Sequence, residues 1–449
     1  MKYNVLQKYE ATVKTLENPY QFEQRQLFDM ALRINEKRRF LFVSQVLGKH
    51  IAVDPSIPLL TSHLLAYRFM EQRYGYVSEF TKTISSAIQT KQNLGTVLAT
   101  SQTKKLTPGN ALTIIGFAET ATALGHGFFE KFDGDVQFVH TTREHIVDIE
   151  PVICFEEEHS HASSHRVYAN EHFILRNAEV VLIDDEMTTG KSKRNIIRQL
   201  YEKYPHLKTF TLVSILDFRT TDSQTAMQQL AQELGITIHC VSLFTGAFQV
   251  EETGKLFNEV VLTGPFAKPL TNEYCFEELL QNALMEQASF CESKHIKHAN
   301  YYRDSGRFAL SLDGQQHLQE HVAQIAAILK QKRSNGPCLV LGTGEFMYVP
   351  MSIAVQMGDD VKYHATTRSP IYSHELSHIY NKFTFPSAEF PGVTNYLYNI
   401  PINEYSDIFV IYERIMDNDA AEVLQAQLQP YANHIHFVTL GGVGNAVYT

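Results

Sequence analysis

Residues Val180–Ser192 read VVLIDDEMTTGKS, and this stretch says more about the fold than any other part of the chain. An apolar run ends in two carboxylates, Asp184 and Asp185, and then passes through TTGKS into a segment with helical spacing. The pattern predicts a strand, a turn and a helix whose first N–H groups and dipole attract an anion. Gly190 would let the backbone approach that anion closely, and the neighbouring hydroxyls would add donors. The stretch therefore predicts a phosphate site beside two carboxylates.

Two other interpretations explain this stretch less well. Aspartate and threonine could act only as helix caps, but a cap needs one such residue and several stand here in succession. TTGKS also resembles the end of a P-loop, whose first glycine would fall at position 185. Asp185 stands there instead, and its carboxylate would repel phosphates.

Short apolar runs alternate with helical patterns throughout the N-terminal half. Five runs are expected to be strands: Ala111–Phe117, Asp135–Thr141, Glu179–Asp184, Thr209–Phe218 and Ile236–Phe244. Helical patterns follow two of them, at 120–132 and 191–204. Strands that alternate with helices predict an α/β fold with a parallel sheet, in which ligands bind at the carboxyl ends of the strands.

The C-terminal half repeats this rhythm. Four more strands are expected: Cys338–Gly342, Val361–Thr366, Asp407–Glu413 and His434–Leu440. Matched positions in the two halves lie at nearly constant offsets of 225 to 228: Gly116 with Gly342, Glu119 with Glu345, Arg143 with Arg368, and Asp184 with Tyr412. The offsets predict a second α/β domain that is a degenerate repeat of the first and lacks its pair of acids.

The region between the two halves is expected to be a linker. Residues 263–299 contain no convincing strand, and FEELLQNALMEQASF within them has a helical pattern. We therefore expect a first domain at 1–265, a helical linker at 266–300 and a second domain at 301–449.

Composition limits the class of protein. The 449 residues carry a net charge of −10 and no long basic run, which argues against nucleic-acid and anionic-membrane partners. The first residues lack the apolar core of a signal peptide, and no stretch approaches the roughly 18 apolar residues of a spanning helix. The five cysteines form no CxxC pair, as expected for reduced thiols. These features predict a soluble cytoplasmic protein.

VVLIDDEMTTG resembles the signature with which type I phosphoribosyltransferases bind 5-phosphoribosyl-1-pyrophosphate (PRPP). That signature is an apolar strand, two acids, a variable pair and Thr-Thr-Gly, from which Glu186 departs slightly because an apolar residue is commoner there. The resemblance implies a parallel sheet flanked by helices, with Asp184 and Asp185 as catalytic residues that hold the ribose. It implies that five residues bind the 5′-phosphate: Thr188, Thr189, Gly190, Lys191 and Ser192.

The resemblance extends to an expected pyrophosphate site. The loop after the first core strand is formed by Gly116, Phe117, Ala118, Glu119, Thr120 and Ala121. The next strand ends at Thr142-Arg143, where relatives use a basic residue on pyrophosphate. Mg²⁺ is the implied cofactor, carried by PRPP rather than by a direct protein ligand.

The segment Phe155–Tyr168, FEEEHSHASSHRVY, is rich in histidine and glutamate. It could bind a transition metal through its His-x-His pattern and nearby carboxylates, or it could be a charged, solvated loop. The family resemblance implies a third interpretation, a mobile lid in which His159, His161 and Arg166 act on the leaving pyrophosphate.

Upstream, Arg38–Pro55 resembles the hood segment of orotate phosphoribosyltransferases, which contacts the base. Phe42 and Ser44, together with Phe40, fit its F-x-L-x-S-G pattern. Gln45 replaces the glycine, and Val43 stands where those enzymes have a base-contacting lysine. Lys49 and His50 are the candidate replacements for that lysine, and the identity of the acceptor stays open.

The string HATTRSP at 364–370 resembles the domain named for Thr-Arg-Ser-Pro. This TRSP domain follows a phosphoribosyltransferase in bacterial proteins from tellurite-resistance and stress gene clusters. Residues 374–378 also match the HExxH motif of zinc peptidases, but they lie in a polar stretch without a long amphipathic helix pattern. The peptidase interpretation is therefore weak.

Together these features predict an enzyme that transfers phosphoribose from Mg-PRPP to a nitrogenous, orotate-like base and releases pyrophosphate, in a stress-linked nucleotide-like pathway. Two alternatives are a regulator that binds PRPP or a nucleotide without turnover, and an enzyme that works in the direction of phosphorolysis. Many members of the family dimerise, so the resemblance also allows a homodimer.

Overall fold

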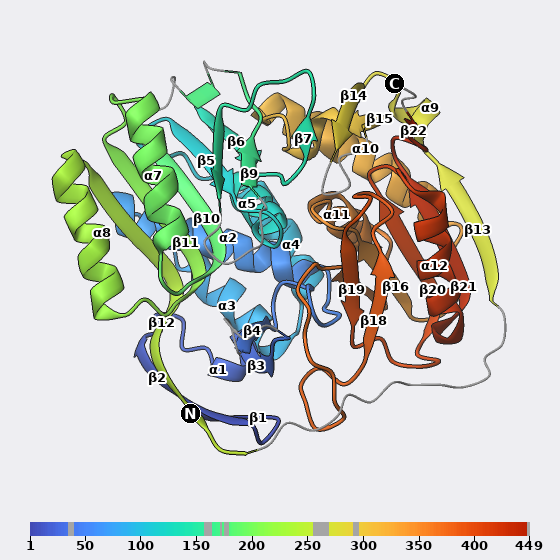
Figure 1. The fold of residues 1–449 in the computed structure, drawn as a ribbon, viewed down its shortest axis with the longest axis horizontal. Helices are drawn as coiled ribbons and strands as arrows, with labels where there is room; N and C mark the ends of the chain where they lie inside the picture. The colour runs from blue at the N-terminus through green and yellow to red at the C-terminus, as the bar shows by residue number, and fades with distance from the viewer. Residues whose placement is uncertain are drawn as a thin grey trace.

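The computed structural model describes residues 1–34, 40–156, 164–170, 173–174, 179–254, 269–290 and 296–446. It contains two α/β units that lie side by side, the N-terminal one blue to green and the C-terminal one orange to red in Figure 1. Among the described residues, no helix is long and apolar enough to cross a membrane.

The N-terminal sheet has seven strands. Their spatial order is β1 (Lys2–Val5), β2 (Tyr9–Glu17), β12 (Thr237–Glu252), β11 (Thr209–Asp217), β10 (Glu179–Met187), β5 (Leu112–Gly116) and β6 (Val136–His140). The five strands from β12 to β6 are parallel, as predicted, and hairpin β1–β2 adds antiparallel to the outer half of β12. Strands β5, β6, β10 and β11 are mostly buried because helices flank the sheet, whereas β12 is exposed or half-buried at most of its positions.

Of the described helices in this unit, three alternate with the parallel strands, as the βα rhythm predicts, and four precede the first of these strands in the chain. They are α1 (Gln24–Leu27), α2 (Ser56–Tyr74), α3 (Phe80–Thr90), α4 (Leu94–Thr103), α5 (Ala121–Phe129), α7 (Lys191–Lys203) and α8 (Thr221–Leu234). Helix α2 is buried along most of its length because it packs against α3, α4, α5 and the sheet. Two hairpins stand outside the sheet, β3 (Phe28–Leu32) with β4 (Phe40–Ser44), and β8 (Ile153–Glu156) with β9 (Ser164–Val167).

The C-terminal unit has a five-stranded parallel sheet. Its order is β13 (Leu270–Cys275), β21 (Ala432–Thr439), β20 (Tyr405–Tyr412), β16 (Cys338–Gly342) and β17 (Val361–Ala365). Its helices are α10 (Leu312–Lys330), α11 (Tyr348–Gln356) and α12 (Asn418–Leu428), with 3₁₀ turns η1 (Arg303–Ser305) and η2 (Gln429–Tyr431). Strands β18 (Lys382–Pro386) and β19 (Thr394–Tyr398) form a hairpin.

The prediction of a helical linker is wrong for the residues described. The region holds β13, a one-turn helix α9 (Glu277–Leu280), β14 (Leu284–Phe290) and β15 (Lys297–Tyr302). Strand β14 pairs with β15 on one side and with β7 (His145–Ile146) on the other, and β22 (Asn445–Ala446) completes this sheet. Strands β7 and β22 are distant in sequence from their partners, and their pairings, together with the β14–β15 hairpin, override the local helical pattern. The boundaries of the domains stay a prediction.

The internal repeat is visible in the register of both sheets. Ile183 of β10 lies opposite Gly116 of β5, and Ile411 of β20 lies opposite Gly342 of β16. Asp184 and Tyr412 therefore follow at equivalent points of the two sheets. Helices α5 and α11 occupy equivalent positions and pack against each other between the sheets, and one hydrophobic core continues through both units.

Candidate functional site

The predicted acid pair lies at the carboxyl end of β10. Asp184 and Asp185 are partly exposed, and the Asp185 N–H donates to Asp184 Oδ1 at 3.0 Å. Lys193, in the first turn of α7, forms an ion pair with Asp184 Oδ2 and lies 4.5 Å from the centre of the Phe117 ring. Sequence reasoning missed Lys193, although it stands one residue beyond the predicted phosphate segment.

The surroundings of Asp185 disfavour its charged form. Burial and the neighbouring Asp184 raise the pKa of Asp185 to about 6, although Lys49 and Lys193 act in the opposite direction. The charged form of a carboxyl is disfavoured by partial desolvation and by a like charge close by. The site therefore carries negative charge that the protein only partly compensates.

The turn after these acids leads directly into α7. Gly190 caps the helix with φ +64°, and a Cβ at this position would lie 3.3 Å from Met227 Cε. The Lys191 N–H approaches Thr189 Oγ1 at 3.4 Å, and Arg194 Nη1 donates to the Thr189 carbonyl at 3.0 Å. The first N–H groups, hydroxyls and the positive end of a 13-residue helix thus meet at the predicted phosphate segment, Thr188–Ser192.

The loop predicted to bind pyrophosphate, Gly116–Ala121, lies beside this turn. The Phe117 N–H donates to the Ile183 carbonyl at 3.0 Å, and the Ala118 N–H donates to Thr141 Oγ1 at 2.8 Å. Lys49 contacts Thr120 Oγ1 and lies 3.8 Å from Glu119 Oε2. The loop is therefore fixed to the end of β10 and to the end of β6.

Arg143 and Arg166 are brought together where β6 ends. Thr142 and Arg166 exchange backbone hydrogen bonds of 2.9 and 2.8 Å, and Arg166 Nη1 donates to the Arg143 carbonyl at 3.1 Å. Glu345 of the C-terminal unit accepts from the Arg143 N–H at 2.9 Å, a contact that sequence reasoning also missed. The repeat offsets could have suggested this contact, if the two repeats are expected to dock against each other as two subunits do.

The predicted lid is only partly described. Its base is hairpin β8–β9, whereas His159 and His161 lie outside the described residues. His165 is buried, and its Nδ1 is 2.8 Å from Thr141 Oγ1 while its ring stacks on Phe155, as for a residue of the core. Among the described residues, no group of three or more His, Cys, Asp or Glu side chains is arranged to hold a metal ion.

Of the predicted hood residues, Phe42 and Ser44 reach the site. They line a narrow cleft with Asp185 and Glu186, and the Phe42 ring stacks on Phe218 with a centroid distance of 4.5 Å. The other two residues lie elsewhere. Lys49 reaches Thr120, as described above, and His50 is buried near Tyr398, where burial holds its pKa well below the usual value. His50 is therefore not placed to contact a base in this cleft, whereas Lys49 lies close enough to Asp185 to lower its pKa.

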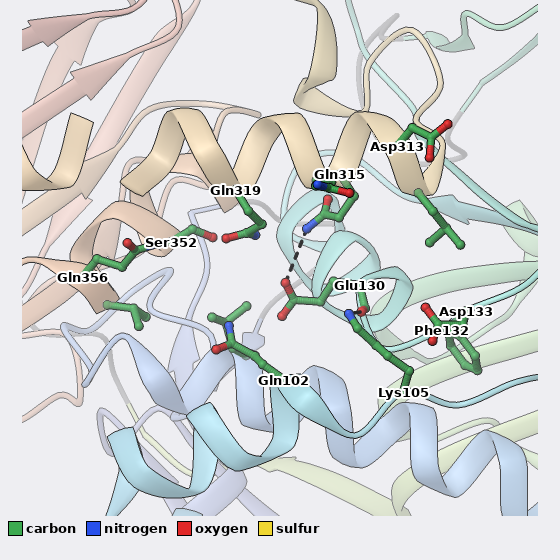
Figure 2. A pocket seen from close by; sticks show the side chains of 14 residues that line it. Gln102, Lys105, Glu130, Phe132, Asp133, Asp313, Gln315, Gln319, Ser352 and Gln356 are labelled. Atoms are coloured by element: carbon green, nitrogen blue, oxygen red, sulfur yellow. Dashed lines mark hydrogen bonds between the residues drawn. The ribbon is translucent and has the colours of Figure 1, made fainter. Parts of the chain in front are cut away.

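A larger hollow of about 540 Å³ lies between the two units, and none of the predicted site residues lines it. Figure 2 shows Glu130 near its centre, with Gln315 and Gln319 reaching in from α10 and Lys105 from the opposite wall. Gln315 donates to Glu130 at 3.5 Å. The acid pair Asp184 and Asp185 therefore remains the candidate site, although the hollow at Glu130 is larger.

The peptidase interpretation of residues 374–378 finds no support. HExxH binds zinc from two successive turns of a helix, but the structure has no helix at these residues. His378 Nδ1 instead lies 3.5 Å from Asp29 Oδ2.

Comparison with protein families agrees with this geometry. A family model described as phosphoribosyl transferase matches residues 27–247, and one described as the TRSP domain C-terminal to that transferase matches residues 304–428. The chain belongs to the phosphoribosyltransferases that carry a TRSP domain. The two matches fall on the N-terminal and C-terminal α/β units, respectively.

Solved phosphoribosyltransferases resemble parts of this chain. Adenine phosphoribosyl transferase from Trypanosoma brucei is 17% identical over 29% of this chain and 55% of its own, with a TM-score of 0.21. Orotate phosphoribosyltransferase from Mycobacterium tuberculosis, solved with PRPP, is 11% identical over 40% and 88%, with a TM-score of 0.20. Adenine phosphoribosyltransferase from Rhodothermus marinus is 12% identical over 49% and 94%, with a TM-score of 0.26.

The chain spans less than two thirds of the length of three solved relatives. It covers 55% of the adenine enzyme of Trypanosoma brucei, 62% of that of Leishmania tarentolae and 59% of the orotate enzyme of Aeropyrum pernix. A search of curated proteins found no match.

Proposed function

We propose that the N-terminal domain of this phosphoribosyltransferase transfers phosphoribose from PRPP to a nitrogen of a base-like acceptor. The observation that carries the proposal is the partly exposed pair Asp184 and Asp185, placed between the start of α7 and the loop Gly116–Ala121. An anion site on each side of two carboxylates suits a pentose that has a phosphate at one end and a pyrophosphate at the other.

Each part of the site then has one role. The first N–H groups of α7 and the hydroxyls of Thr188–Ser192 bind the 5′-phosphate, and the loop Gly116–Ala121 with Arg143 binds pyrophosphate. Asp184 and Asp185 accept hydrogen bonds from the ribose hydroxyls. The bond from C1 to the pyrophosphate oxygen breaks, a bond from C1 to nitrogen forms, and the nitrogen loses a proton. The carboxylates stabilise the positive charge that develops on the ring, so their contribution is mainly electrostatic.

Mg²⁺ fits this site as a companion of the substrate. Two adjacent carboxylates are too few ligands for a dedicated cage, but Mg²⁺ commonly binds through one or two carboxylates together with substrate phosphates. Here PRPP would carry the Mg²⁺, and Asp184 and Asp185, which hold the ribose, would lie beside it without binding it directly. When bound, it supplies neutralisation of the pyrophosphate charge.

The acceptor is proposed to bind beside the acids, where the cleft has a volume of only about 10 Å³ and must widen to admit a base. The described lining of this cleft is largely apolar, with Phe42 on one side, and its charged members are Asp185 and Glu186. This lining favours a flat, neutral base over orotate, because acidic side chains repel a carboxylate. A cytoplasmic location and a role in stress-linked biosynthesis belong to the same proposal and are supported by the composition and by the TRSP domain.

Pyrophosphate release tests the proposal. The full chain is incubated with Mg²⁺, PRPP and a panel of bases, and the double variant Asp184→Asn/Asp185→Asn is compared with Asp222→Asn, an exposed acid of α8. We expect release with at least one base, loss of it in the double variant, and normal rates in the control. Turnover that survives the double variant would show that the site is assigned wrongly. PRPP binding without turnover on any base would favour a regulator.

A further inference from the structure

The C-terminal domain reaches into the proposed pyrophosphate site through Glu345. This carboxylate accepts hydrogen bonds from Thr142 Oγ1 at 2.6 Å and from the Arg143 N–H at 2.9 Å. It is 2% exposed and pairs with Arg307 at 2.8 Å. A buried, charged acceptor therefore holds the short segment that carries Arg143.

The same contact occurs again with the domains exchanged. Glu119, the repeat counterpart of Glu345, accepts from Thr367 Oγ1 at 2.9 Å and from the Arg368 N–H at 3.2 Å. Thr367 and Arg368 are 225 residues beyond their counterparts in the N-terminal domain. Each domain thus inserts one glutamate into the equivalent Thr-Arg segment of the other.

Backbone pairings across the interface are reciprocal as well. Phe138 of β6 exchanges hydrogen bonds of 3.0 and 2.7 Å with Leu310, and Tyr363 of β17 exchanges bonds of 2.8 and 3.0 Å with Val53. Each domain also donates one backbone hydrogen bond of 2.8 Å to a hairpin of the other. The Tyr372 N–H donates to the Leu32 carbonyl of β3, and the Val147 N–H donates to the Ala288 carbonyl of β14. Lys49 beside Glu119 likewise corresponds to Arg307 beside Glu345.

Reciprocal contacts of this kind define the interface of a two-fold symmetric dimer, in which residue i contacts j and j contacts i. Here one chain forms both halves. We infer that the TRSP domain is a built-in partner subunit of the transferase domain, and that Glu345 is a positioning residue that fixes Arg143 for pyrophosphate. The inference rests on the proposed function, since it assigns pyrophosphate to Arg143.

Glu345 is suited to this task because its carboxylate stays ionised. Burial alone would favour the neutral form, but Arg307 and Arg368 lower the pKa of Glu345 to about 2. An ionised acceptor makes stronger hydrogen bonds than a neutral one. Thr142, which Glu345 holds, also pairs with Arg166, so one carboxylate orients the backbone of both arginines.

Binding of two separate probes to the full chain tests the inference. Isothermal titration calorimetry is run with Mg²⁺-pyrophosphate and with ribose 5-phosphate on the wild type, on Glu345→Gln and on Glu389→Gln. Glu389 is a matched control because it lies in the same domain, is also 2% exposed, and has a pKa that burial raises to about 8. It is mostly protonated at pH 7, so glutamine resembles its native state.

We expect Glu345→Gln to weaken pyrophosphate binding roughly tenfold, as for the loss of a hydrogen bond to a charged group, and to leave ribose 5-phosphate within twofold. The control should bind both probes as the wild type does. An equal loss of both probes in Glu345→Gln, or no loss of pyrophosphate, would overturn the inference while the proposed function stands. A wild type that binds neither probe would overturn the proposed function first.

A second variant covers the case in which Glu345→Gln does not fold. Glu345→Asp keeps the negative charge beside Arg307 but withdraws the carboxylate by one methylene. The same selective loss of pyrophosphate binding is expected, and unchanged pyrophosphate binding would count against the inference.

Discussion

The ends of β10 and β20 occupy equivalent points of the two domains, yet their side chains differ in kind. Near the end of β10 lie Asp184 and Asp185, partly exposed and beside a helix start. After β20 come Glu413 and Arg414, which are both fully buried. We call the partly exposed end of β10, with Asp184 and Asp185, the open end, and the buried end of β20, with Glu413 and Arg414, the closed end.

At the closed end, buried charges compensate one another. Arg307 lies 3.1 Å from Glu144, 2.8 Å from Glu345 and 3.0 Å from Glu413. Arg414 pairs with Glu413 at 2.9 Å and with Glu144, and its guanidinium stacks 3.9 Å from the centre of the Tyr301 ring. Charges that neutralise each other in the protein hold domains together, whereas uncompensated charges are available to a ligand. The same topology thus serves structure in one domain and binding in the other.

Removing a central cation should have the largest effect. Arg307→Ala would leave three buried carboxylates with too little positive charge, and we expect the free energy of unfolding to fall by about 3–5 kcal/mol. Urea denaturation followed by fluorescence measures this change. Arg198→Ala removes an exposed pair with Glu233 and should leave stability nearly unchanged. Equal stability of the two variants would contradict the structural role of the closed end.

At the open end, a single neutral substitution should lower activity without lowering stability. Asp185→Asn removes a charge that the fold disfavours, so we expect the thermal midpoint to stay equal or rise slightly. Turnover should fall roughly 100-fold or more, because a group that stabilises the developing ring charge is lost. Glu413→Gln, the equivalent change in the second repeat, should lower the midpoint. A midpoint that falls in both variants would remove the contrast.

Much of this architecture could be predicted from sequence because it depends on local patterns. The strand Cys338–Gly342 appears with the predicted bounds, and the acids at 184 and 185 occupy the expected strand end. Strands β14 and β15 could not be predicted, since β14 pairs with β7 more than 130 residues away and its own residues have a helical pattern. Pairing across such a distance leaves no signal in a short window.

The candidate site also has a part that could be predicted from local sequence and a part that could not. Asp184 to Ser192 are contiguous, so their order revealed the turn and the helix start. The direction of the Lys193 side chain depends on which face of α7 meets β10, and the contact of Glu345 with Arg143 depends on how two domains dock. Lys49 and His50 were expected near the base, but the path of the chain after β4 buries His50 near Tyr398, and Lys49 remains a prediction.

The pH dependence of turnover should report on the open end. The pKa of Asp185 is raised to about 6 in the fold, so its carboxylate is charged above that pH and gains a proton below it. A protonated acid accepts hydrogen bonds poorly and cannot stabilise positive charge. We expect kcat/KM to fall tenfold per pH unit below about 6, measured in buffers of constant ionic strength. A flat profile between pH 5 and 8 would exclude Asp185 from the reaction.

The smallest expected effect concerns the cation that partly compensates this acid pair. Lys193 lowers the pKa of Asp185 and pairs with Asp184, so Lys193→Met should move the acidic limb of the pH profile to higher pH. Lys208→Met changes an exposed lysine that touches only Tyr201 Oη among its described contacts, and it should leave the limb in place. The shift sharpens the contrast between the domains, because the open end then responds to the loss of a single lysine, whereas the closed end is held by two buried arginines. An unmoved limb in Lys193→Met would mean that the ion pair with Asp184 does not persist in solution, and that Lys49 is the cation that acts on Asp185.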